Sequence, residues 1–151
     1  MTKEYYTPTI EEFHIGFEFE KYDNRPAIYK ENDFKPTNWH KHTYNLTSIR
    51  LSQLDTHLYN KTLRVKYLDK EDIEILGFRR DMVRTTLVNN FIFYKDNISL
   101  SFDNQINDLK ISVLTKSERT CDLFVGHIKN ISELKLLLKQ LEIENVINAT
   151  K

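Results

Sequence analysis

The sequence predicts an α+β fold: a mostly antiparallel β-sheet with a short middle helix and a C-terminal helix packed on one face. Residues 8–20 alternate between apolar and polar side chains, which is the period of a half-buried strand. Residues 87–128 contain short apolar runs separated by turn residues, which favours strands joined by short turns. Four leucines then recur at the spacing of one helix face: Leu134, Leu137, Leu138 and Leu141.

The length of 151 residues favours a single domain over residues 1–151, in which 145–151 form a frayed tail. The chain has 22 basic and 22 acidic residues, so no overall field directs it to nucleic acid or to a membrane. We find neither a signal-like N-terminal segment nor an apolar run of membrane-spanning length. Cys121 is the only cysteine, which excludes an intrachain disulfide and suggests a reducing compartment. We therefore expect a cytoplasmic protein.

The first element is expected to be an extended strand over residues 8–20. Its buried face would carry four large apolar side chains, those of Phe13, Ile15, Phe17 and Phe19. Its exposed face would carry an imidazole and three carboxylates, from His14, Glu12, Glu18 and Glu20. Four large apolar groups from one strand are enough to start a core.

The segments that follow are less regular. Residues 22–26 have turn chemistry, residues 27–29 are expected to form a short returning strand, and residues 31–39 a loop. Residues 39–46 alternate weakly. Residues 48–60 permit either a short helix or a strand, because their leucines fit both periods.

A strand and a two-turn helix are predicted over residues 63–76. Residues 63–67 alternate as a strand does. Asp69 is suited to the N-cap of the helix, and acidic residues follow in its first turn. Gly77 then supplies the left-handed conformation that ends helices.

The second half predicts a β-meander and a closing helix. The strands are expected at 91–94, 98–102, 109–114 and 123–128. Cys121 is expected to be a small buried thiol of a strand. The helix begins after Asn130, which has the spacing of a capping box with Glu133. Its leucine stripe should lie on the sheet.

Three stretches give the chain a family resemblance. They are YTPTIEEFHIGFEFE near the start, LRVKYLDKEDIEILGF in the middle and FVGHIKNISELKLLLKQL near the end. In these stretches the chain resembles a family of small proteins without known activity, encoded by Bacteroidota and their phages. The resemblance implies a short, intracellular, phage-linked gene product. It implies no activity and no catalytic residue.

A metal or acid–base site is the first functional hypothesis. His40 and His42 would point together from one strand, and His14, Glu18 and Glu20 would share a face of the opening strand. If the two segments pair, these side chains would suit Zn²⁺, Mn²⁺ or Mg²⁺. The alternative is a solvated sheet face beside a polar loop. We expect no cofactor other than such a divalent ion.

Other enzyme classes have little support. Residues 16–20, Gly-Phe-Glu-Phe-Glu, are similar to the glycine-then-ExE strand of amidoligase and glutamine-synthetase-like enzymes, in which alternate glutamates hold magnesium. The chain is too short for the further strands of that fold. No spacing marks a Cys–His dyad around Cys121, and three scattered glycines cannot build a phosphate-binding loop.

A nucleic-acid surface is the second hypothesis. Residues 35–68 mix aromatic and basic side chains, a combination that stacks bases and neutralises phosphates. These side chains belong to Trp39, Tyr44, Tyr59, Lys35, Lys41, Arg50, Lys61 and Arg64. The neutral net charge of the chain counts against this hypothesis, and the same aromatic residues fit a core equally well.

A protein-binding surface is the third hypothesis. Arg79, Arg80 and Arg84 fit an anion-binding patch for an acidic partner, or else a solvated cluster. A sheet of short strands leaves an edge, and self-association through an edge strand is the simplest protein contact. We therefore predict a non-enzymatic interaction module, a phage or prophage accessory protein that binds a protein partner or forms a homo-oligomer in the host cytoplasm. A small metal-dependent enzyme and a nucleic-acid-binding module are the alternatives.

Overall fold

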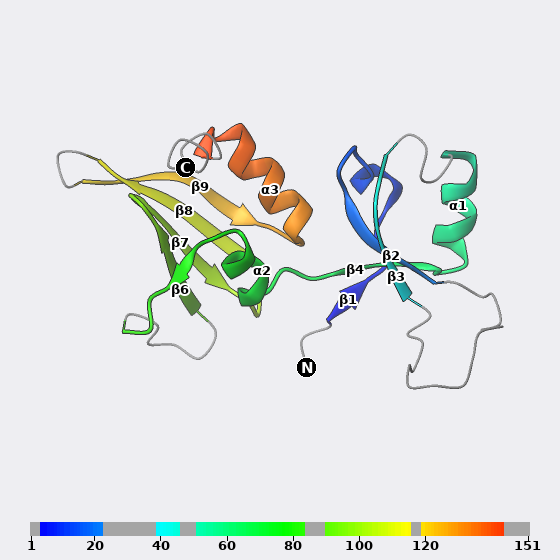
Figure 1. Ribbon diagram of the computed structural model, residues 1–151, viewed down its shortest axis with the longest axis horizontal. Coiled ribbons are helices and arrows are strands. Elements are labelled where there is room, and N and C mark those ends of the chain that lie inside the picture. The colour runs from blue at the N-terminus through cyan, green and yellow to red at the C-terminus, as the bar shows by residue number, and fades with distance from the viewer. Residues whose placement is uncertain (1–3, 23–38, 46–50, 84–89, 116–118, 144–151) are drawn as a thin grey trace. The chain divides into compact units, whose positions relative to one another are not determined.

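The computed structural model describes residues 4–22, 39–45, 51–83, 90–115 and 119–143. These residues confirm the predicted α+β class, since they form two antiparallel sheets and three α-helices. The chain divides into two compact units, an N-terminal unit of Lys3–Lys66 and a C-terminal unit that contains Tyr67–Lys151 (Figure 1). Each unit has its own hydrophobic core. The single domain expected over residues 1–151 stays a prediction.

The N-terminal unit is built on a four-stranded sheet with the strand order β1-β4-β2-β3, in which every pair is antiparallel. The strands are β1 (Tyr5–Tyr6), β2 (Glu18–Tyr22), β3 (Trp39–Thr43) and β4 (Leu63–Lys66). The unit also contains the 3₁₀ helix η1 (Ile10–Glu12) and the helix α1 (Leu51–Tyr59). Its core consists of Phe17, Phe19, Tyr44, Leu54, Leu63 and Val65.

The strand predicted over residues 8–20 is wrong in its first half. The helix η1 lies inside this range, and β2 begins only at Glu18. Thr9 and Glu12 form a capping box, in which the Thr9 backbone N–H donates to the Glu12 carboxylate over 3.1 Å. Such local hydrogen bonds compete with an extended backbone. Gly16 then has a left-handed φ of +91°, which interrupts a regular strand.

The burial predicted for this segment holds in its second half. Phe17 and Phe19 are buried in the core, whereas Ile15 forms a turn with Gly16 and is 71% exposed. Phe13 lies outside the strand but still packs against the core. Its ring centroid lies 4.9 Å from that of Phe17 and 5.5 Å from that of Phe19. The turn therefore removes one of the four expected apolar groups from the core.

The middle of the chain was only partly predictable. The weak alternation at 39–46 corresponds to β3, and residues 48–60 contain the helix α1. The turn expected at 22–26, the strand at 27–29 and the loop at 31–39 lie almost entirely outside the described residues.

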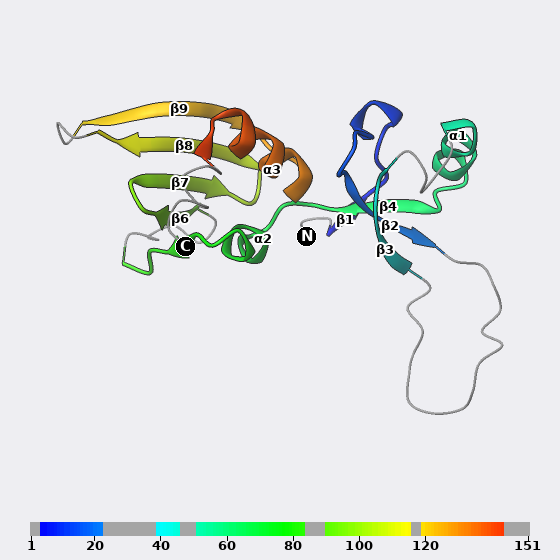
Figure 2. The ribbon, with the colours of Figure 1, turned by 45° about the horizontal axis from the view of Figure 1, so that its top comes forward.

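The C-terminal unit contains a five-stranded antiparallel sheet in the order β5-β6-β7-β8-β9, so that each strand pairs with its neighbour in sequence. Figure 2 shows β6, β7, β8 and β9 side by side in this order. The strands are β5 (Arg79–Arg80), β6 (Asn90–Lys95), β7 (Ile98–Asp103), β8 (Asp108–Leu114) and β9 (Thr120–His127). The predicted meander is confirmed, and β9 begins earlier than expected.

The helix α2 (Lys70–Ile75) begins and ends where the sequence predicts. The Asp69 carboxylate accepts a hydrogen bond from the Asp72 backbone N–H over 3.0 Å, and the Asp72 carboxylate accepts one from the Asp69 N–H over 3.2 Å. Gly77 follows with a φ of +86°. Both ends of this short helix are therefore fixed by local chemistry.

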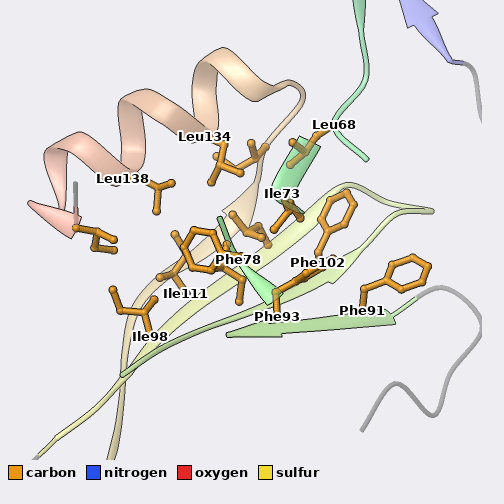
Figure 3. Packing of buried hydrophobic residues seen from close by; sticks show 14 residues of the cluster. Leu68, Ile73, Phe78, Phe91, Phe93, Ile98, Phe102, Ile111, Leu134 and Leu138 are labelled. Atoms are coloured by element: carbon orange, nitrogen blue, oxygen red, sulfur yellow. The ribbon is translucent and has the colours of Figure 1, made fainter. Parts of the chain in front are cut away.

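The helix α3 (Ile131–Gln140) packs on the sheet of the same unit, as predicted. Asn130 caps it by accepting a hydrogen bond from the Glu133 N–H over 3.0 Å, and the Glu133 carboxylate accepts one from the Lys129 N–H over 2.7 Å. Figure 3 shows the side chains of Leu134 and Leu138 directed from α3 towards the sheet. None of the helices in the described residues is long and apolar enough to cross a membrane.

Candidate interaction surfaces

One face of the N-terminal sheet holds a row of stacked planar side chains. Arg64 lies opposite Glu20 in the strand register, and its Nε and Nη2 atoms donate to Glu20 Oε2 over 2.8 and 2.7 Å. The Arg64 guanidinium carbon lies 3.9 Å from the ring centroid of Tyr5 and 4.2 Å from that of Trp39. The ring of Tyr22 makes an edge contact with Trp39, with 5.2 Å between centroids. One ion pair and its stacking partners therefore connect all four strands.

This row brings together residues that the sequence hypotheses kept apart. Glu20 was a candidate metal ligand and Arg64 a candidate nucleic-acid contact, and the structure joins them in one ion pair. Burial and the nearby Glu20 carboxylate raise the pKa of Tyr5 above its usual value. Because the guanidinium is already stacked between two rings and paired with a carboxylate, we interpret the row as a structural element of the sheet.

The candidate metal ligands are distributed over two sheet faces and a loop. They are His14, Glu18, Glu20, His40 and His42. His42 lies opposite Phe19 on the core face, and the two rings are stacked with their centroids 5.6 Å apart. His40 lies opposite Lys21 on the same face. Glu18 and Glu20 occupy the other face, because side chains alternate along β2. His14 precedes β2. In residues 4–22, 39–45 and the other described ranges, no three His, Cys, Asp or Glu side chains are grouped to hold a metal.

The surroundings of His42 favour a neutral ring. Partial burial, followed by the charges of Lys21 and His40, lowers the pKa of His42. A neutral imidazole is the form that binds metals. On the paired strand β2 the neighbours of His42 are an aromatic ring and an ammonium group, so only His40, two residues along β3 on the same face, is a suitable second ligand. The described residues place no third ligand beside these two histidines.

The candidate nucleic-acid residues do not share one surface. Trp39 and Lys41 lie on the same sheet face as Glu20, since Lys41 is directly opposite Glu20 in the register. Tyr44 is buried in the core of the unit. The residues Lys35 and Arg50 lie outside the described part of the chain. The aromatic ring of Tyr44 therefore serves packing.

The candidate arginine patch is also divided. Arg79 and Arg80 are consecutive residues of β5, so their side chains point to opposite faces of the sheet. The Arg80 guanidinium carbon lies 4.5 Å from the ring centroid of Phe91, which places it over the edge of the core. Arg84 lies outside the described residues.

The strand β9 forms one edge of the C-terminal sheet. Among the described strands it pairs only with β8, so one side of its backbone has no strand partner there. Leu123, the extra residue of a β-bulge, is 39% exposed, and Val125 is 70% exposed. The prediction that Cys121 is buried is wrong, because this edge position leaves its side chain exposed.

The charged groups of β9 are already paired within the sheet. The Asp122 carboxylate accepts a hydrogen bond from the Ser112 hydroxyl over 2.9 Å and lies 2.9 Å from Lys110 Nζ. His127 Nδ1 lies 2.6 Å from Asp108 Oδ1. The strand contains no lysine, arginine or proline. Its edge is therefore apolar at the centre, and the side chains of Asp122 and His127 both have partners on β8.

β9 differs from the other edges of the described sheets. The edge strands β1 and β5 are two residues long each, and β3 carries Lys41 between two histidines. Short length and positive charge are common protections of an edge against the addition of another strand. β9 is eight residues long and carries no lysine or arginine, and the β-bulge at Leu123 is its one such protection. It is the described edge best suited to accept a further strand.

We expect the Asp122 contact to make stability depend on pH. Hydrogen bonds from Lys110 and Ser112 lower the pKa of Asp122 in the folded state. The Asp122 carboxylate therefore makes its full contribution to the free energy of unfolding above the ordinary aspartate pKa. This contribution is lost as the pH falls through the lowered pKa of the folded state. Asp122→Asn should lower the free energy of unfolding at pH 7, and this loss should shrink towards about pH 3.

Urea denaturation at both pH values checks this prediction, and Lys110→Gln should reproduce the same trend because it removes the partner. A loss that is equal at both pH values would show that the contribution does not depend on the charge of Asp122.

Comparisons with known proteins add no assignment. No protein-family model matches the sequence, and neither a curated protein nor a solved structure matches it. The resemblance to small proteins of Bacteroidota and their phages stays a prediction. The function is therefore inferred from the surfaces described above.

Proposed function

We propose that the protein is a non-enzymatic interaction module, and that its β9 edge accepts an extended strand from another protein chain. The character of β9 is the observation that carries this proposal: eight residues at a sheet edge, exposed Leu123 and Val125, and no lysine or proline to block pairing. In strand addition, main-chain hydrogen bonds provide affinity and alternate side chains provide specificity. The apolar pair would supply that specificity here.

The biological setting is part of the same proposal. The resemblance to small proteins of Bacteroidota and their phages supports an accessory role for a phage or prophage, exercised in the host cytoplasm. A protein that acts by binding needs no converged catalytic cluster, only a rigid surface. The five-stranded sheet and its covering helix provide such a surface in the C-terminal unit.

Val125→Lys is expected to abolish strand addition, because an ammonium group on the edge opposes a further strand. Ile75→Lys is the matched control, since Ile75 lies on α2 and is 74% exposed against 70% for Val125. Tagged wild type, Val125→Lys and Ile75→Lys would each be used for affinity capture from lysates of a Bacteroidota host, with and without phage infection. We expect a partner that binds the wild type and Ile75→Lys and is lost at least about tenfold with Val125→Lys.

The purified complex then locates the contact. Amide hydrogen exchange should slow in Thr120–His127 when the partner is bound. A partner that Val125→Lys retains, or protection confined to other strands, would contradict the proposal. Circular dichroism of each variant confirms that it is folded before the capture is interpreted.

A further inference from the structure

We infer that the strand received by β9 is β9 of a second copy of this chain, paired antiparallel about a twofold axis. This inference rests on the proposed function, because it names the partner of the same edge. An axis perpendicular to the sheet would extend five strands into a continuous sheet of two identical halves. Such an interface is isologous, so the same surface serves both copies.

The sequence of β9 is suited to pairing with itself. Counted along the chain, an antiparallel pair centred on Phe124 sets Leu123, the residue of the β-bulge, opposite Val125 of the other copy. Both side chains are exposed in the single chain. Directly opposite apolar residues are the pairs that stabilise a sheet. Centring the pair on Val125 would instead bring the two Val125 side chains together, so neighbouring registers also join apolar groups.

Charge does not oppose this pairing. An identical strand always brings identical charges, so unpaired charges on an edge would repel a second copy. In β9 the Asp122 carboxylate is held by Lys110 at 2.9 Å, and His127 by Asp108 at 2.6 Å. Both pairs are formed within each copy. β3, with Lys41 at its centre, is the contrasting case in the other sheet.

The expected dimer is weak and depends on concentration. Eight residues at about 3.4 Å each give a contact about 27 Å long. A single strand pair of this length falls at the small end of the specific protein interfaces. The experiment must therefore span a wide range of concentration.

Sedimentation velocity and amide hydrogen exchange of the whole chain at roughly 10 µM and roughly 1 mM test the inference. We expect the wild type and Ile75→Lys to shift from the 18.1 kDa monomer towards twice that mass as concentration rises. The amides of β9 should exchange at least about tenfold more slowly at the higher concentration. Val125→Lys should stay monomeric throughout. Leu123→Lys is the second variant should Val125→Lys fail to fold.

The outcomes separate this inference from the proposed function. A wild type that stays monomeric at both concentrations, with unchanged exchange in β9, overturns the second copy as partner. A dimer that Val125→Lys still forms overturns it as well. In either case, capture of another protein that depends on Val125 would leave strand addition at β9 standing. If that capture is also absent, both proposals fail.

Discussion

Replacement of Leu134 by alanine is expected to lower the free energy of unfolding by about 2–5 kcal/mol. Leu134 is fully buried in the core of the C-terminal unit. Figure 3 shows it directed from α3 towards the apolar side chains of the sheet. Truncation removes buried methyl groups and leaves a cavity that the surrounding side chains fill only in part. Urea denaturation followed by far-UV circular dichroism measures the loss.

Leu136→Ala is the matched control on the same helix. Leu136 lies two residues further along α3 and is 42% exposed, so the identical change should alter stability by no more than about 0.5 kcal/mol. Equal losses for the two variants would mean that α3 presents a different face to the sheet. The pair therefore tests the orientation of the helix as well as its burial.

The same denaturation series tests the predicted single domain. Trp39 is the only tryptophan and belongs to the N-terminal unit, so its fluorescence reports that unit. If the chain is one cooperative domain, Leu134→Ala in the other unit shifts the fluorescence and circular dichroism transitions together. A shift seen by circular dichroism alone would show that the two units unfold separately.

Features fixed by neighbouring residues could be predicted from the sequence. Asp69 and Gly77 mark the two ends of α2 because a cap and a left-handed glycine act within a few residues. The meander follows from apolar runs of strand length separated by short turns, since such turns pair consecutive strands. The α+β class depends on these local signals, and it is confirmed.

The candidate surfaces depend on contacts between distant residues. Glu20 and Arg64 form an ion pair although they are 44 residues apart in the sequence, and no sequence pattern predicts this contact. The position of β9 at an edge follows from strand order, which the sequence of one strand does not contain. The composition of Thr120–His127 does contain a signal for an edge that can accept a further strand, because the segment lacks the lysine or proline that often protects an edge.

Phe17→Ala is expected to lower the free energy of unfolding by about 3–5 kcal/mol. Phe17 is fully buried, and its ring packs against those of Phe13 and His14, with centroids 4.9 and 5.7 Å away. The core of the N-terminal unit is small, so neighbouring side chains have little means of filling the space. Urea denaturation followed by the fluorescence of Trp39, which lies in the same unit, measures the loss.

Ile15→Ala tests whether Ile15 lies in the turn before β2 or in a continuous strand over residues 8–20. A continuous strand over residues 8–20 would bury Ile15 beside Phe17, and its truncation would then cost about 2–5 kcal/mol. The turn at Gly16 instead leaves Ile15 71% exposed, so the change should alter stability by no more than about 0.5 kcal/mol. Comparable losses for Ile15→Ala and Phe17→Ala would require an extended strand through Gly16. A large loss at Phe17 alone is expected, because only the part of the segment after the turn reaches the core.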